Sequence, residues 1–202
     1  DGNLKIKREK EISLQSDFTS EIKIDKKNII NYLPIFRNIK YINQEINLNA
    51  NFDNFLNIYF DKTFKVTKYV YTNKGKINKS SIKLNKPIQN LILEKDTNYL
   101  YLDNSNFNTR YASDKKNYVH ASGVYSTNNS NYQKYDLKNN FFKEASNINL
   151  NLNFVEKVYI DFINYKKDSD KVANVFLNIE TKKDTINLKE FKYLENKNRI
   201  LI

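Results

Sequence analysis

Ile46-Asn47-Leu48-Asn49-Ala50-Asn51-Phe52 is the stretch that decides the fold, because apolar residues and asparagines alternate in it without a break. It returns about a hundred residues later as Ile148-Asn149-Leu150-Asn151-Leu152-Asn153-Phe154, identical at six of seven positions. Successive side chains of a β-strand point to opposite faces, so each stretch predicts a strand with one apolar and one polar side. We call these two stretches the ladders.

A second apolar alternation follows each ladder at the same offset. It consists of Leu56, Ile58 and Phe60 in the first copy and of Val158, Ile160 and Phe162 in the second. Self-similarity at a fixed spacing is typical of an architecture that repeats one supersecondary unit. We therefore expect a single repeat-built domain over residues 1–202, with half-repeats at approximately 26–110 and 136–202. The chain starts with Asp1 and contains no Met, which predicts an excerpt of a longer protein.

Strand patterns continue along most of the chain. The alternation is nearly unbroken from Ile12 to Asp25, and the other predicted strands are 46–52, 56–60, 64–71, 76–84, 90–94, 98–102, 108–113, 117–126, 131–136, 148–154, 157–163, 172–181, 184–189, 190–194 and 200–202. Turn-forming groups such as Asp53-Asn54 and Asn73-Lys74-Gly75 separate some of them. Short helices are predicted at 26–39, where apolar residues have helical spacing, and at 136–145.

Short connections favour antiparallel meanders, since parallel strands need crossovers of a dozen residues or more. The sequence therefore predicts an all-β protein with one or two short helices. The apolar face of such strands must be covered. More protein would cover it in a β-sandwich or barrel, whereas lipid acyl chains could cover an open, curled sheet.

Composition restricts the function classes without choosing one. The net charge is +11, but the lysines are spread along the chain, which favours a solvated face over a nucleic-acid site. About one residue in six is Asn, and the bias toward Lys, Asn, Ile, Tyr and Phe is typical of an AT-rich genome. There is no Cys for disulfides or thiolate metal sites, and no apolar run of about 18 residues that could span a bilayer.

Residues for catalysis are scarce. The one histidine, His120, shares the alternation of a strand with Tyr118, which favours a structural role. The three glycines are too far apart for a phosphate-binding loop, and Asp168 and Asp170 lack the Gly and Glu of an EF-hand. We expect no enzyme activity, no catalytic residue, no metal site and no cofactor.

Three phrases carry a resemblance to a known family. They are Asn31-Tyr32-Leu33-Pro34, Gly75-Lys76-Ile77 and the closing Leu188-Lys189-Glu190-Phe191-Lys192-Tyr193-Leu194-Glu195-Asn196-Lys197-Asn198-Arg199-Ile200. With the long amphipathic strands between them, the chain resembles the AsmA-like superfamily of bacterial envelope proteins. The resemblance covers most of the chain as a pattern of strands and phrases, without a sharp signature motif.

The resemblance implies a curled open sheet, or β-groove, that carries phospholipid between the inner and outer membranes and helps to build the outer membrane. It also implies a periplasmic location and an inner-membrane anchor outside this segment. The expected partners are phospholipid acyl chains and the inner membrane, with no nucleic acid. The expected groove lining is Ile46, Leu48, Phe52, Leu56, Ile58, Phe60, Ile148, Leu150, Leu152, Phe154, Val158, Ile160 and Phe162.

An alternative stays open at this point. The same ladders could form the core of a surface or adhesin-like β-sandwich that binds a protein or glycan through its loops. The Asn- and Tyr-rich region 103–135 is the candidate for those loops.

Overall fold

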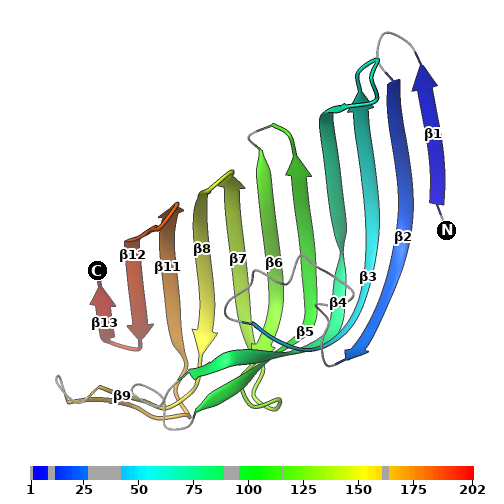
Figure 1. Cartoon of the computed structure of the whole chain (residues 1–202). Helices are drawn as coiled ribbons and strands as arrows, with labels where there is room; N and C mark the ends of the chain where they lie inside the picture. The colour runs from blue at the N-terminus through cyan, green and yellow to red at the C-terminus, as the bar shows by residue number, and fades with distance from the viewer. Residues whose placement is uncertain (1, 9–11, 27–41, 89–95, 115, 161–163) are drawn as a thin grey trace.

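The computed structural model describes residues 2–8, 12–26, 42–88, 96–114, 116–160 and 164–202, and in these ranges every regular element is a β-strand. Eleven strands form one antiparallel sheet in the order β1-β2-β3-β4-β5-β6-β7-β8-β11-β12-β13, and β9 and β10 form a separate two-stranded sheet. The sheet does not close, since β1 and β13 lie at opposite edges (Figure 1). The predicted all-β antiparallel meander and its open form are confirmed.

The strand bounds are β1 (Gly2–Arg8), β2 (Ile12–Lys26), β3 (Ile42–Phe60), β4 (Val66–Ile88), β5 (Thr97–Ala112), β6 (Asn117–Ser126), β7 (Gln133–Phe142), β8 (Ala145–Phe154), β9 (Val158–Ile160), β10 (Tyr165–Lys167), β11 (Ala173–Lys182), β12 (Thr185–Glu195) and β13 (Asn198–Leu201). The region 103–135 therefore contributes to β5, β6 and β7 and is not a cluster of loops.

The strands near the N-terminus are longer than the sequence predicts. β3 has 19 residues and β4 has 23, so the turns expected at Asp53-Asn54 and at 73–75 are wrong. Asn54 instead pairs with Asn73 inside the sheet, and Gly75 pairs with Phe52. Continuous pairing on both sides holds these turn-prone residues extended, so tertiary context overrides their local preference.

The helix predicted at 136–145 is also wrong, because β7 and the turn into β8 occupy these residues. Tyr135 and Leu137 alternate with exposed Asp136 and Lys138, which is the period of a strand. The helix predicted at 26–39 lies outside the described residues except for Lys26, which ends β2. The strand predicted at 90–94 lies outside them entirely.

Tight turns use asparagine and lysine where glycine is scarce. Lys143, Lys183 and Asn196 have φ angles of 53°, 51° and 50° in the turns that follow β7, β11 and β12. Asparagine tolerates the left-handed region better than most residues, so the Asn-rich composition supports a meander with only three glycines.

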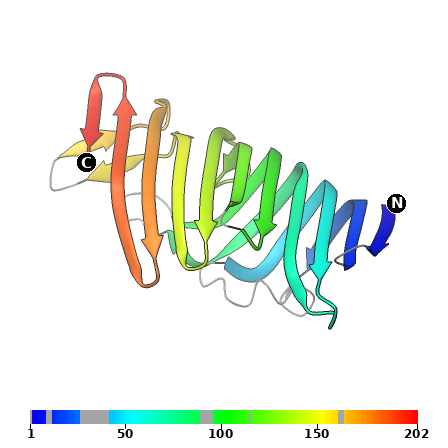
Figure 2. The ribbon, with the colours of Figure 1, turned by 90° about the horizontal axis from the view of Figure 1, so that it is seen from above.

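The fold is largely a single layer. Its accessible surface is 14211 Å², whereas a compact monomer of this mass, 24.0 kDa, would expose about 9,900 Å². The sheet is seen from above in Figure 2, as a twisted ribbon of strands beside the small β9–β10 hairpin. Among the described residues, the buried apolar set is small: Ile46, Ala50, Ile77, Leu102, Ala112, Ala121, Val158, Ala173 and Tyr193.

Candidate functional site

An unbroken row of directly paired residues crosses the sheet and connects the two ladders. Paired residues of an antiparallel sheet share a face, so every member of the row points to the same side. The row runs Phe52, Gly75, Phe107, Ala121, Leu137, Leu150, Leu177 and Phe191. We call this side the ladder face and the opposite side the polar face.

The ladder face contains ten of the thirteen residues predicted to line a groove. Ile46, Leu48, Phe52, Leu56, Ile58 and Phe60 alternate along β3, and Ile148, Leu150, Leu152 and Phe154 alternate along β8. Val158 and Ile160 belong instead to β9, which pairs with β10. Phe162 lies outside the described residues.

The two ladders run in opposite directions across this face. Five pairings separate β3 from β8 in the antiparallel order, so Phe52 shares its row with Leu150 rather than with Phe154. The first ladder continues without a break into Leu56, Ile58 and Phe60, whereas the second ends at Phe154. The division into half-repeats stays a prediction.

The sequence pattern did not reveal several residues of the same row. Leu137 lies in the predicted helix 136–145, and Phe107 lies between the predicted strands 98–102 and 108–113. Leu177 and Phe191 are in predicted strands, but only the register identifies their face. The alternation of Tyr135 and Leu137 with Lys134, Asp136 and Lys138 was the available signal for β7.

Toward both edges the ladder face exposes large apolar side chains. Leu4 and Ile6 of β1 are 63% and 64% exposed, and Ile186 of β12 is 72% exposed. The pairings of Leu4 with Ser16 and of Ser16 with Leu56 place β1 on the same face. The only other sheet in the described ranges is the two-stranded β9–β10 hairpin. Exposed apolar side chains thus lie at both ends of the ladder face.

Two β-bulges on adjacent strands bend the sheet. β4 has one extra residue, Asn78, relative to β3, and in β5 both Asn104 and Ser105 lie opposite Gly123. Asn104 has a φ angle of 46°, in the left-handed region. A bulge bends its strand and increases the local twist. Beyond this point the lower ends of β4 and β5 turn across the sheet in Figure 1.

Burial shows that the ladder face is on the inside of this bend. Ala50 and Ser105, on the ladder face, have no exposed surface, whereas Lys76 and Asn106 on the polar face are exposed. The described part of the ladder face is therefore concave near the bulges and open toward the opposite strand ends.

A hydrogen-bonded polar island lies within the ladder face. The Asn54 Nδ2 donates to the Phe18 carbonyl oxygen at 3.1 Å and to Ser20 Oγ at 3.0 Å. The Asn54 Oδ1 accepts from Tyr71 Oη at 2.7 Å and from Asn73 Nδ2 at 2.8 Å. Because these groups satisfy one another, the island can tolerate an apolar ligand beside it.

The β9–β10 hairpin is attached to the sheet through buried polar groups. The Tyr165 hydroxyl lies 2.7 Å from that of Tyr193 on β12 and donates a hydrogen bond to the Glu195 carboxylate. This bond holds the pKa of Glu195 below its usual value, although burial opposes the shift, and burial raises the pKa of Tyr165. Nothing in the sequence pattern pointed to this cluster.

Lys167 of the same hairpin has no exposed surface. Its Nζ donates to the carbonyl oxygens of Glu156 at 2.9 Å and Asp168 at 3.1 Å, and it lies 5.6 Å from the centre of the Phe154 ring. Burial lowers the pKa of Lys167, while the nearby carboxylates, Glu195 first, raise it. The Lys167 ammonium group thus lies beside Phe154, the last residue of the second ladder.

Replacing Glu195 with glutamine should remove a pH-dependent part of the stability. A carboxyl whose folded pKa is depressed stabilises the fold above its unfolded pKa, here 4.5, and loses this effect as the pH falls through the folded value. Near neutral pH the free energy of unfolding of the Glu195→Gln chain should be lower than that of the unmodified chain. By about pH 3 the difference between the two free energies should be smaller. Urea unfolding at both pH values measures it. Glu144→Gln, an exposed carboxyl in the β7–β8 turn, should show no such narrowing.

Two substitutions of Lys167 should distinguish the contribution of its aliphatic chain to stability from the contribution of its charge. Lys167→Met keeps the aliphatic chain but leaves the carbonyl oxygens of Glu156 and Asp168 without their donor, so the free energy of unfolding should fall by about 1 kcal/mol. Lys167→Ala also removes the packed methylenes and should cost about 2 kcal/mol more. Urea midpoints of the two variants test this, and equal losses would show that the charge itself stabilises the hairpin.

The remaining predicted chemistry is sparse in the structure. The His120 ring stacks on Tyr118 with centroids 4.6 Å apart, as their shared face predicts, and its buried Nε2 has no hydrogen-bond partner. Arg110 forms a bidentate ion pair with Asp114, with both N–O distances 2.7 Å, and this pair holds the pKa of Asp114 far below its usual range. Across the described ranges, no three His, Cys, Asp or Glu side chains converge to hold a metal ion.

Comparison with known proteins adds no relative: no protein-family model, no curated protein and no solved structure matches the chain. Within the described residues, no helix has the length and apolar character that crossing a bilayer requires.

Proposed function

We propose that the chain is a non-enzymatic lipid-binding segment whose ladder face holds phospholipid acyl chains. The observation that supports this proposal is the row from Phe52 to Phe191, which places uncharged, non-polar residues on one face of eight successive strands. The polar groups of a phospholipid would then stay in water at the open side of the bend.

Burial energetics are adequate for such binding. Removing apolar surface from water contributes about 25 cal/mol per Å², or about 0.8 kcal/mol for each buried CH₂ group. Leu4, Ile6 and Ile186 present apolar surface that is still exposed in the folded chain. An acyl chain can therefore bind the ladder face without displacing other protein groups from these positions.

The cellular setting of the proposal comes from the resemblance to the AsmA-like superfamily. By that analogy the segment conducts phospholipid between the inner and outer membranes, lies in the periplasm and is anchored in the inner membrane through a segment outside this one. The ladder face would bind the acyl chains during transfer, and the lysines and asparagines of the polar face would keep the outside of the sheet hydrated.

Lipid analysis of the purified chain tests the proposal. The chain is expressed in a bacterium with two membranes, purified without detergent, and its organic extract is examined by mass spectrometry. We expect phospholipid in a fixed ratio to protein, at a level that washing with high salt does not reduce. A chain that remains folded and carries no lipid, even after incubation with phospholipid vesicles, would contradict lipid binding.

A further inference from the structure

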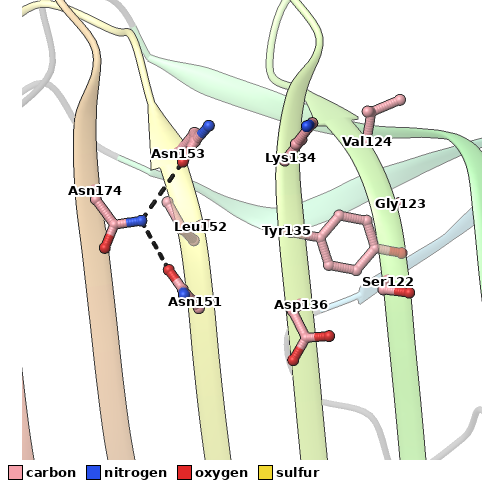
Figure 3. Close-up of a pocket in the computed structure, with 10 residues that line it drawn as sticks. All are labelled: Ser122, Gly123, Val124, Lys134, Tyr135, Asp136, Asn151, Leu152, Asn153 and Asn174. Atoms are coloured by element: carbon pink, nitrogen blue, oxygen red, sulfur yellow. Dashed lines mark hydrogen bonds between the residues drawn. The ribbon is translucent and has the colours of Figure 1, made fainter.

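The polar face carries two shallow depressions between its side chains, of about 530 Å³ and about 480 Å³. They share Ser122 of β6 and Asp136 of β7 and are therefore adjacent, and we call the two depressions together the groove. Figure 3 shows the larger depression, with Asn151 and Asn153 of β8 and Asn174 of β11 beside Lys134 and Asp136. This groove is on the opposite side of the sheet from the ladder face.

Short side chains along one paired row form the floor of the groove. Asn106, Ser122, Asp136 and Asn151 are directly paired from β5 to β8, so each strand contributes one hydrogen-bonding group. Neighbouring strands lie about 4.8 Å apart. A linear ligand lying across the strands would therefore meet a new polar group at each step of about this length.

Two asparagines of the groove, Asn151 and Asn153, are held in place by a third, Asn174. The Asn174 Nδ2 donates to Asn151 Oδ1 at 2.9 Å and to Asn153 Oδ1 at 3.5 Å. These bonds fix the two amides of β8 through their oxygens, and the NH₂ groups of Asn151 and Asn153 keep their capacity to donate. Pre-ordered amides lose little conformational freedom when a ligand binds.

The charges that line the groove nearly balance. Lys74, Lys76 and Lys134 face Asp53 and Asp136, so the +11 charge of the whole chain is not concentrated here. A nucleic acid or other polyanion needs a site with several uncompensated Lys or Arg residues. The amides, the serine and the balanced charges instead match a ligand rich in hydroxyl and amide groups.

We propose that this groove binds an extended, uncharged oligosaccharide that lies across strands β4 to β8. The amide side chains would exchange hydrogen bonds with its hydroxyl and N-acetyl groups, one sugar following another along the row. Because the groove and the ladder face are on opposite sides, the two sites are separate, and the oligosaccharide proposal does not depend on lipid binding.

Titration of the ¹⁵N-labelled chain with a hexamer of β-1,4-linked N-acetylglucosamine tests the proposal. We expect saturable shifts of the backbone amides of Asn106, Ser122, Asp136 and Asn151, with a Kd on the order of 1 mM that does not change with salt. Absence of saturable shifts at about ten times that concentration would overturn it. Tighter, salt-sensitive binding of a sulfated oligosaccharide of equal length would overturn it in favour of a polyanion.

A double variant and a control variant test whether the hexamer binds in the groove. Asn106→Leu combined with Asn151→Leu removes two amides from the floor and should weaken binding of the hexamer about tenfold or more, because two hydrogen-bonding groups are lost. Asn140→Leu, on the polar face of β7 outside the groove, is the matched control and should bind as the unmodified chain does. Equal affinity of the double variant, with its circular dichroism unchanged, would place the hexamer elsewhere.

Discussion

Replacing Gly75 with valine should disrupt the pairing of β3 with β4 and lower the free energy of unfolding by more than about 3 kcal/mol. A Cβ atom at position 75 would lie 2.0 Å from the carbonyl oxygen of Asn51 and 2.7 Å from the Cα of Phe52. Both are backbone atoms of the neighbouring strand, so no rotamer change can relieve the contact. The Phe52 ring, with its Cδ1 2.6 Å from the same point, occupies the remaining space.

Urea unfolding followed by far-UV circular dichroism measures this loss. The matched control is Gly2→Val in β1, where the added Cβ would also be close to its neighbours, 2.7 Å from Phe18 Cβ. An edge strand has a partner on one side only and can shift outward, so the control should cost about 1 kcal/mol or less. If Gly75→Val were as stable as the control, Gly75 would not be paired between β3 and β5.

A Leu150→Asp chain should lose most of its phospholipid while keeping its strands. Leu150 lies between Leu137 of β7 and Leu177 of β11 at the centre of the ladder face. A carboxylate there would have to lose its hydration when an acyl chain covers it, and that cost opposes binding. We expect affinity for phospholipid to fall at least tenfold, which corresponds to about 1.4 kcal/mol. Phe52→Asp and Phe154→Asp should act in the same direction.

Transfer of a fluorescent phosphatidylethanolamine from vesicles to the chain provides the measurement. Asn149→Asp is the matched control, since it adds the same carboxylate to the adjacent residue of β8 on the polar face. It should bind lipid as the unmodified chain does. Unfolding of Leu150→Asp would show that Leu150 belongs to a protein core, and equal lipid binding by both variants would place the lipid away from the ladder face.

The ladders allowed the class of the fold to be predicted because period-two alternation depends only on the geometry of a strand. The ladder at 148–154 predicts a strand in this way, and β8 contains it. Asparagine caused most of the errors. It is normally a turn residue, yet Asn54 lies inside β3 and pairs with Asn73 of β4, so the turn predicted at Asp53-Asn54 divides what is one strand.

The candidate site was only partly predictable, for a related reason. Alternation shows which residues of one strand share a face, but register shows which faces of different strands coincide. Val158 and Ile160 repeat the spacing of Leu56 and Ile58, yet they leave the large sheet because the second ladder ends at Phe154. Buried Lys167 gave no signal, since a lysine in a charged segment is normally solvated.

Because the strands of the large sheet follow one another in chain order, the width of the ladder face depends on how many hairpins the chain contains. Every neighbour in the large sheet is also the next strand along the chain, except where β8 and β11 enclose the β9–β10 hairpin. Insertion or loss of one hairpin would lengthen or shorten the face by two strand spacings, about 10 Å, and leave the other pairings unchanged. Evolution could thus change the width of the ladder face by adding or removing hairpins, without redesigning a core.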